Sequence, residues 1–128
     1  MAETEKITIN MSVVDLGKVD LLVDEGFFST RTDFIRSAIR RQLDKHENKV
    51  EESITRKAMV MGVMVFTEEA LKKRLDKNEK ISAFVVGMLL IEDNVEPELA
   101  DAVFESIQVY GVFRANKSVK QILADRVC

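Results

Sequence analysis

The sequence predicts an α+β protein with two parts: a strand followed by two helices, and then an α/β unit of three strand–helix repeats with a parallel sheet. Three observations support this prediction. Residues 6–11 alternate between apolar and polar side chains, residues 12–46 show two helical patterns, and the remainder holds three apolar runs. The glycines within these runs are 25 and 24 residues apart, at Gly62, Gly87 and Gly111. The expected boundaries are 1–48 for the first part, 49–57 for a polar connection and 58–128 for the repeats.

The composition excludes several classes of protein. Of the 128 residues, 46% are hydrophobic and 32% are charged, which is typical of a folded domain with a charged surface. No run approaches the roughly 18 apolar residues that a membrane-spanning helix needs, and the acidic start is unlike a signal peptide, so we expect a cytoplasmic protein without a membrane partner. Cys128 and His46 are the only residues of their types, which argues against a disulfide or a metal site. No cofactor motif and no catalytic constellation is present, so neither a cofactor nor an enzyme activity is expected.

The segment 6–11 is a strand that needs a partner. Its side chains alternate, so that Ile7, Ile9 and Met11 fall on one face and Lys6, Thr8 and Asn10 on the other. A lone six-residue strand is not stable, and the nearest strand with which it can pair is the same segment of a second copy. An antiparallel ribbon of two copies would bury the apolar face and expose the polar one.

Two helices are expected after this strand. Ser12 is a plausible N-cap of the first helix, with Asp15 completing the start signal, and Gly26 is expected to end that helix. Thr30 and Asp33 form a second start signal. The apolar side chains of the second helix include Phe34, Ile35 and Ile39, and together with the strand they exceed what one copy of about 48 residues can cover. An intertwined homodimer would bury them in a shared core, with dimer-core residues Ile7, Ile9, Met11, Phe34, Ile35 and Ile39.

The residues K-I-T-I-N-M, followed by a helix and by G-F-F-S-T-R-T-D-F-I-R-S-A-I, closely resemble the ribbon-helix-helix repressors of the CopG, Arc and MetJ type. The resemblance covers about residues 5–46. It implies double-stranded DNA as a partner, with Lys6, Thr8 and Asn10 contacting bases in the major groove. It also implies that Ser29, Thr30 and Arg31, at the start of the second helix, contact phosphates. The alternative is that the polar row is only the hydrated face of a dimerising ribbon.

The local charges give modest support to a DNA-binding role. Residues 31–49 contain six basic and three acidic side chains, whereas residues 12–28 contain one basic and four acidic ones. The net charge of the chain is −3, which argues against indiscriminate binding to nucleic acid. Arg36, Arg40 and Arg41 are expected to be mostly solvated or paired with nearby acids.

Residues 58–128 predict a stacked β–α array. Residues 49–57, which connect it to the first part, are either a charged linker or a helical extension. The expected strands are 59–66, 84–91 and 109–113, and the expected helices are 68–77, 97–107 and 117–126. The continuity of the apolar runs predicts a well-covered sheet, and the glycines predict a bend or a close backbone approach. The methionines at positions 59, 61, 64 and 88 are expected in the core. An ordinary small α/β domain with coincidental spacing is the alternative.

These features predict a DNA-binding transcriptional regulator, more specifically a repressor. It would act as a homodimer, or as a tetramer or larger assembly, with its second part serving oligomerisation or effector or partner binding. The alternative is an antitoxin-like interaction module whose second part binds a partner protein. An enzyme is disfavoured because the sequence offers no catalytic set.

Overall fold

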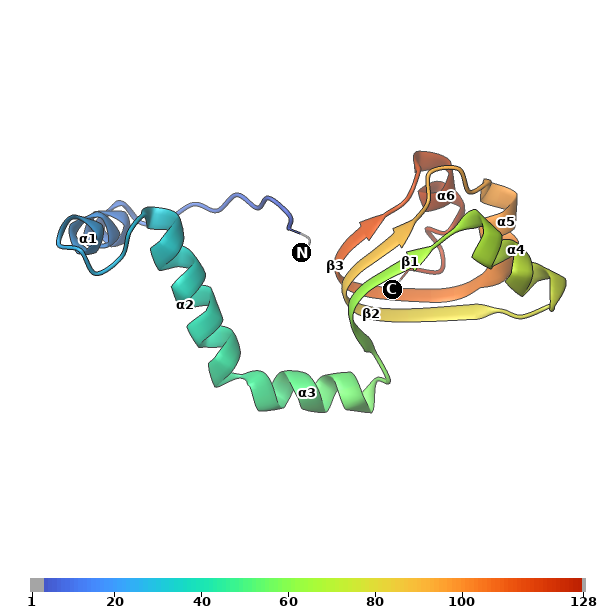
Figure 1. Cartoon of the computed structure of the whole chain (residues 1–128), viewed down its shortest axis with the longest axis horizontal. Coiled ribbons are helices and arrows are strands. Elements are labelled where there is room, and N and C mark those ends of the chain that lie inside the picture. The colour runs from blue at the N-terminus through green and yellow to red at the C-terminus, as the bar shows by residue number, and fades with distance from the viewer. Residues whose placement is uncertain (1–3, 128) are drawn as a thin grey trace. The chain divides into compact units, whose positions relative to one another are not determined.

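The computed structural model describes residues 4–127, in two compact units that meet between residues 51 and 52. Helix α3, Glu47–Arg56, contains this boundary (Figure 1). The segment from Asp44 to Lys57 is therefore largely helical, but a break at His46 separates α3 from the preceding helix. Each unit is described by itself below.

The first unit consists of α1, Val13–Asp24, and α2, Arg31–Lys45. Their predicted start signals are confirmed: the backbone N–H of Asp15 donates to Ser12 Oγ, and that of Asp33 donates to Thr30 Oγ1. The predicted stop is confirmed as well, since Gly26 has a φ of +87°. The helix ends in a Schellman pattern: the N–H of Gly26 donates to Val23 O, three residues before it, at 3.1 Å, and the N–H of Phe27 donates to Leu22 O, five residues before it, at 3.0 Å.

The expected strand at 6–11 is not formed in the single chain. Residues 4–12 have no regular secondary structure. A ribbon strand makes its hydrogen bonds to a second copy, which a single chain lacks, so the antiparallel ribbon stays a prediction.

The second unit alternates strands and helices. It contains β1 (Val60–Phe66), α4 (Glu68–Asp76), β2 (Ile81–Ile91), α5 (Pro97–Val103), β3 (Phe104–Arg114) and α6 (Lys117–Ile122). The strands form a parallel sheet in the order β1-β2-β3, which confirms the predicted strand–helix repeats and parallel pairing. Thr67 and Asn116 cap α4 and α6 as expected, each accepting the N–H of the residue three positions later.

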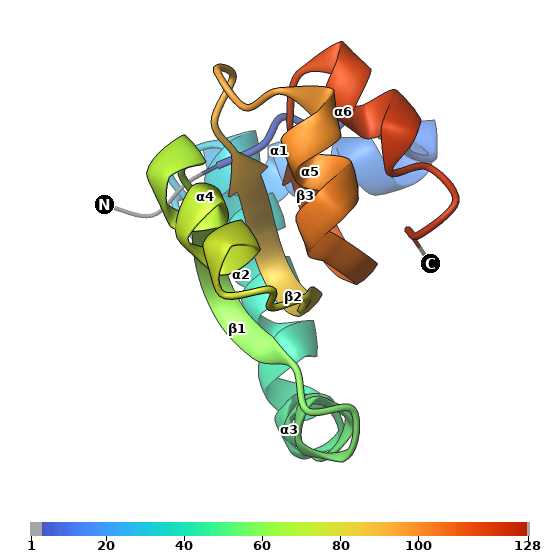
Figure 2. The same cartoon turned by 90° about the vertical axis from the view of Figure 1, so that its right-hand side faces the viewer.

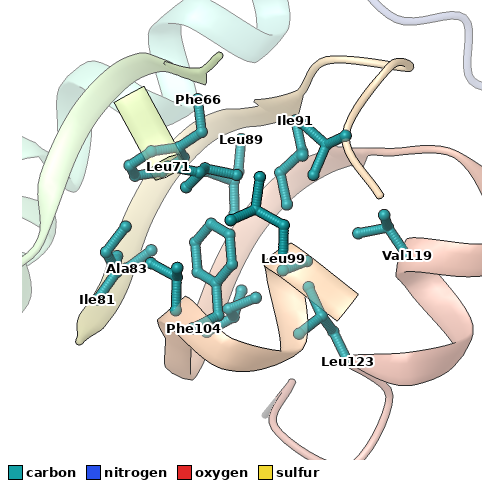
Figure 3. Close-up of a cluster of buried hydrophobic side chains, with 14 of the residues drawn as sticks. Phe66, Leu71, Ile81, Ala83, Leu89, Ile91, Leu99, Phe104, Val119 and Leu123 are labelled. Carbon is teal, nitrogen blue, oxygen red and sulfur yellow. The ribbon is translucent and has the colours of Figure 1, made fainter. Parts of the chain in front are cut away.

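The three helices cover one face of this sheet. Figure 2 shows α4 and α5 in front of the strands, and α5 contacts both α4 and α6. Figure 3 shows how Leu71 from α4, Leu99 from α5, and Val119 and Leu123 from the α6 region converge on side chains of the strands. Phe66 and Phe104 meet edge to face within this core, with ring centroids 5.2 Å apart.

A row of glycines crosses the sheet. Gly62 pairs with Gly87, which pairs with Gly111, and all three have φ between +125° and +137°. A Cβ added at Gly87 would lie 2.1 Å from the carbonyl oxygen of Gly62, and one at Gly111 would lie 2.0 Å from that of Gly87. The row therefore marks the predicted close backbone approach. Figure 1 shows the strands bending sharply part-way along their length and curling around the side that carries the helices.

The end of α5 differs from the expectation. The helix ends at Val103 rather than at residue 107, and β3 begins at Phe104. Phe104 and Ile107 are almost completely buried, because a register shift near the start of β3 lets both side chains reach the helix-covered face. Tertiary packing thus overrides the helical pattern of the sequence here.

The expectation of a well-covered sheet is wrong for the single chain. No helix of the described residues in this unit covers the second face, which we call the outer face, and Met61, Val63 and Val65 of β1 are exposed there. The expectation for the methionines holds in part. Met59 and Met88 are buried and Met64 is half-buried, but Met61 is not part of the core.

Candidate nucleic-acid interface

The three predicted base-contacting residues all lie on the surface. Lys6, Thr8 and Asn10 are exposed, and they are spaced two residues apart in a segment without internal hydrogen-bonded structure. In an extended conformation this spacing directs the three side chains to one side. They offer an ammonium donor, a hydroxyl and an amide, which can donate to guanine or pair with both edge atoms of adenine.

The side chains between them are exposed although they are apolar. Ile7 is 72% exposed and Ile9 is 60% exposed, and Ile39 of α2 is exposed as well. The other predicted dimer-core residues, Met11, Phe34 and Ile35, are only half-buried. Val19 is the one fully buried apolar residue among those described in the first unit. Exposure of this much apolar surface on so small a unit indicates that another surface covers it.

A groove beside α2 adds to this uncovered surface. It is lined by Phe28, Phe34, Ser37 and Ala38 together with polar and charged residues further along α2. Phe28 and Phe34 meet edge to face, with ring centroids 4.9 Å apart. The groove therefore has apolar walls and an opening to solvent, as expected for half of a shared core.

The predicted phosphate-contacting residues lie at the start of α2, but several of their polar groups already have partners. The backbone N–H and the hydroxyl of Ser29 both donate to Asp33 Oδ2, at 3.0 and 3.2 Å. Thr30 Oγ1 accepts the N–H of Asp33 at 3.0 Å, which leaves its own hydroxyl hydrogen for another acceptor. The carboxylate of Asp33 thus occupies part of the positive end of the helix, where an anion would otherwise bind.

Arg31 is held by α1 rather than left for DNA. Its Nε donates to Asp20 Oδ1 at 2.7 Å and its Nη2 donates to Asp20 Oδ2 at 2.9 Å, in a bidentate pair across the two helices. These hydrogen bonds lower the pKa of Asp20 and raise the pKa of Arg31. This pair is not among the features predicted from the sequence. The acidic side chains of the first helix were the available signal, but nothing in the sequence shows which of them meets Arg31.

What remains free at the start of α2 is the main chain. The first N–H groups of a helix have no acceptor within it, and this leaves the N–H groups of Arg31 and Thr32 directed outward at the positive end of the dipole. With the hydroxyl of Thr30 they can donate to one phosphate. Further along α2, Arg36, Arg40 and Arg41 are exposed and form no ion pair with any residue that the structure describes.

Other kinds of site find no support in the described part of the chain. Between residues 4 and 127 no three His, Cys, Asp or Glu side chains gather as metal ligands. None of the helices in the same range is both long enough and apolar enough to cross a bilayer.

Comparison with known proteins gives one match. The model of the Ribbon-Helix-Helix transcriptional regulator family matches residues 2–120, which extends well beyond the segment that carries the resemblance in the sequence and into α6. Neither the curated proteins nor the solved structures with which the chain was compared contain a match.

Proposed function

The chain belongs to the ribbon-helix-helix transcriptional regulator family, and from this premise we propose that it is a sequence-specific DNA-binding repressor that acts as a homodimer or a higher oligomer. Residues 5–11 of two copies pair antiparallel and enter the major groove, which is wide enough for a two-stranded ribbon. The twofold symmetry of the ribbon predicts an operator with two inverted half-sites.

The exposure of Ile7 and Ile9 is the observation that carries this proposal. Both are apolar, both lie between the polar side chains of the ribbon segment, and neither is covered by the first unit. A second strand and the α2 helix of the partner would cover them. Pairing would also turn Lys6, Thr8 and Asn10 of both copies to the same side, as a row that reads base edges.

The division of labour within the interface follows from the contacts at α2. Lys6, Thr8 and Asn10 discriminate between sequences, and the main chain at Arg31 and Thr32 with the hydroxyl of Thr30 fixes the ribbon on the phosphate backbone. Because the guanidinium of Arg31 is already paired with Asp20, this grip uses few free cations. We therefore propose that the protein binds by hydrogen bonds more than by net charge, in accord with its overall charge of −3.

The test is selection of bound sequences from random duplex DNA by the full chain, followed by affinity measurement with the enriched duplex. Asn10→Ala removes one base contact from each copy. Each such contact is worth about 1–3 kcal/mol, so the two together should weaken binding by at least about 30-fold. Asn48→Ala, on the exposed surface of α3, is the matched control and should bind as the parent does. Equal affinities of Asn10→Ala and Asn48→Ala would contradict the ribbon assignment.

A second candidate function is an antitoxin-like interaction module whose second unit binds a partner protein. The exposed apolar side chains of β1 favour it, since they offer a surface that a partner could cover. In that case the selection would enrich no sequence, and the protein would co-purify with a stoichiometric partner. Enrichment of a symmetric operator by the isolated full chain would support the regulator instead.

A further inference from the structure

The two edges of the sheet in the second unit are protected to different degrees. At the free side of β3, the N–H of Ile107 donates to the carbonyl of Arg126 at 3.0 Å, and Ile107 forms a bridge with Val127. Glu105 and Arg114 add charges to that strand. Bridges of this kind and charged side chains are the usual means by which an edge strand avoids pairing with another chain.

The edge formed by β1 has none of these protections. Its seven residues, V-M-G-V-M-V-F, contain no charged side chain and no proline, and within residues 4–127 it pairs with β2 alone. The carbonyl of Phe66 accepts the N–H of Glu92 from the β2 side. Because backbone groups alternate along a strand, those of Val63 and Val65 point to the free side. This edge is therefore a template for another strand.

The free edge of β1 also leaves an empty space beside Gly62. At Gly87 and Gly111, the space that a Cβ would occupy holds the carbonyl oxygen of the neighbouring strand's glycine. Gly62 has the same unusual conformation, with a φ of +130°, but nothing lies within 4 Å of its Cβ position. The space beside Gly62 is therefore empty, whereas the corresponding space beside Gly87 and Gly111 is filled by a backbone carbonyl of the neighbouring strand.

We propose that the free edge of β1 pairs antiparallel with β1 of a second copy of this chain, in a register centred on Val63. A twofold axis between identical strands requires the antiparallel orientation, and only a register centred on Val63 pairs all seven residues. In this register Met61 lies opposite Val65 of the partner, and two three-stranded sheets become one continuous sheet. The absence of charge suits self-pairing, because any charged side chain near the axis would meet its own like charge.

A second copy is the occupant favoured by the rest of the molecule. The inference rests on the proposed dimerisation through the first unit, which holds two second units at a local concentration of the order of mM. The bend of the strands makes the outer face convex, so that two such faces could touch only over a small area (Figure 1). Pairing of backbone groups along the free edge of β1 does not require the two outer faces to meet, and it would also cover part of Met61, Val63 and Val65.

Disulfide cross-linking of the full chain tests the register directly. In a Cys128→Ser background, Val63→Cys places two thiols at the twofold axis, where paired Cα atoms are about 5.5 Å apart and within disulfide range. Val65→Cys is the matched control on the same strand, since the two positions are 50% and 52% exposed. Its two thiols would be offset by four residues, or roughly 13 Å, which is too far to bridge.

The expected result is that mild oxidation cross-links Val63→Cys at least about tenfold faster than Val65→Cys, as the difference in thiol separation requires. A mixture of Met61→Cys and Val65→Cys chains should cross-link faster than either variant alone. Equal rates for Val63→Cys and Val65→Cys, or no cross-link from either, would overturn the pairing and favour a different protein at this edge. Failure of the DNA-reading proposal is distinguishable, because Asn10→Ala would then leave operator affinity unchanged while the cross-linking pattern of β1 persisted.

Discussion

Release of Arg31 from Asp20 should increase both the affinity for DNA and its dependence on salt. The variant Asp20→Asn removes the charge that holds the guanidinium, while keeping a side chain of similar size. Arg31 lies at the first position of α2, beside the main-chain groups that we assign to a phosphate. A freed guanidinium there can neutralise that phosphate, which the paired one does not.

The magnitude follows from counterion release. Each neutralised phosphate on B-DNA contributes about −0.9 to the slope of log K against log salt concentration. A homodimer carries two copies of Arg31, so the slope for Asp20→Asn should be steeper than that of the parent by about 1.8. Between 50 and 200 mM salt, the variant should therefore lose about 12-fold more affinity than the parent does.

Fluorescence anisotropy of a labelled operator duplex, titrated at several salt concentrations, measures both quantities. Asp24→Asn is the control, because Asp24 is another exposed acid of α1 and forms no ion pair among the described residues. It changes the net charge by the same amount without freeing an arginine. If Asp20→Asn and Asp24→Asn gave the same slope, the effect would be general charge repulsion, and the assigned phosphate contact at Arg31 would be refuted.

Three further predictions concern stability. Gly87→Ala should lower the free energy of unfolding of the second unit, measured in urea, by at least about 1–3 kcal/mol because of its positive φ alone, and the 2.1 Å contact to Gly62 O adds to the loss. Gly17→Ala, at a position of α1 with free space around it, should instead raise the free energy of unfolding by about 0.5–1 kcal/mol. Equal effects of the two substitutions would contradict the close approach of the strands. Leu71→Ala, at a completely buried site, should cost about 2–5 kcal/mol, and a loss below 1 kcal/mol would contradict its place in the core. The pKa of Asp20 is lowered in the folded state, so its contribution to stability is present above the unfolded-state pKa and disappears as the pH falls through the folded-state pKa. The difference in unfolding free energy between the parent and Asp20→Asn should therefore vanish in acid. A difference that persisted in acid would have another cause.

Local signals in the sequence predicted the two helices of the first unit well. A cap depends on residues three positions apart, as with Ser12 and Asp15, and a helix stop depends on one residue such as Gly26. The pairing of Arg31 with Asp20 could not be predicted in the same way. It joins residues eleven positions apart, and it depends on how α1 crosses α2 rather than on either helix alone.

In the second unit, local patterns in the sequence predicted the repeats but not the features that depend on tertiary packing. The 24- to 25-residue spacing of the glycines predicted the strand–helix repeats, because each repeat places its glycine in register with the next. The end of α5 was predicted four residues too late, since the residues after Val103 suit a helix but fill the sheet side of the core. The uncovered outer face was not predicted, because apolar continuity shows that a strand prefers burial and not which molecule buries it.

The proposed pairing of β1 offers a way to strengthen the binding of the ribbon to DNA. The ribbon segment offers one cation per copy, Lys6, and Arg31 at the start of α2 is already paired with Asp20. One way to compensate is to join the two chains of a ribbon dimer at a second place, because the ribbon then forms at the local concentration set by β1 pairing. Pairing of β1 within a ribbon dimer therefore raises the fraction of chains whose ribbon is already formed before DNA binds. The acidic net charge then limits binding to non-specific DNA, while the base contacts of the ribbon set the affinity for an operator with matched half-sites.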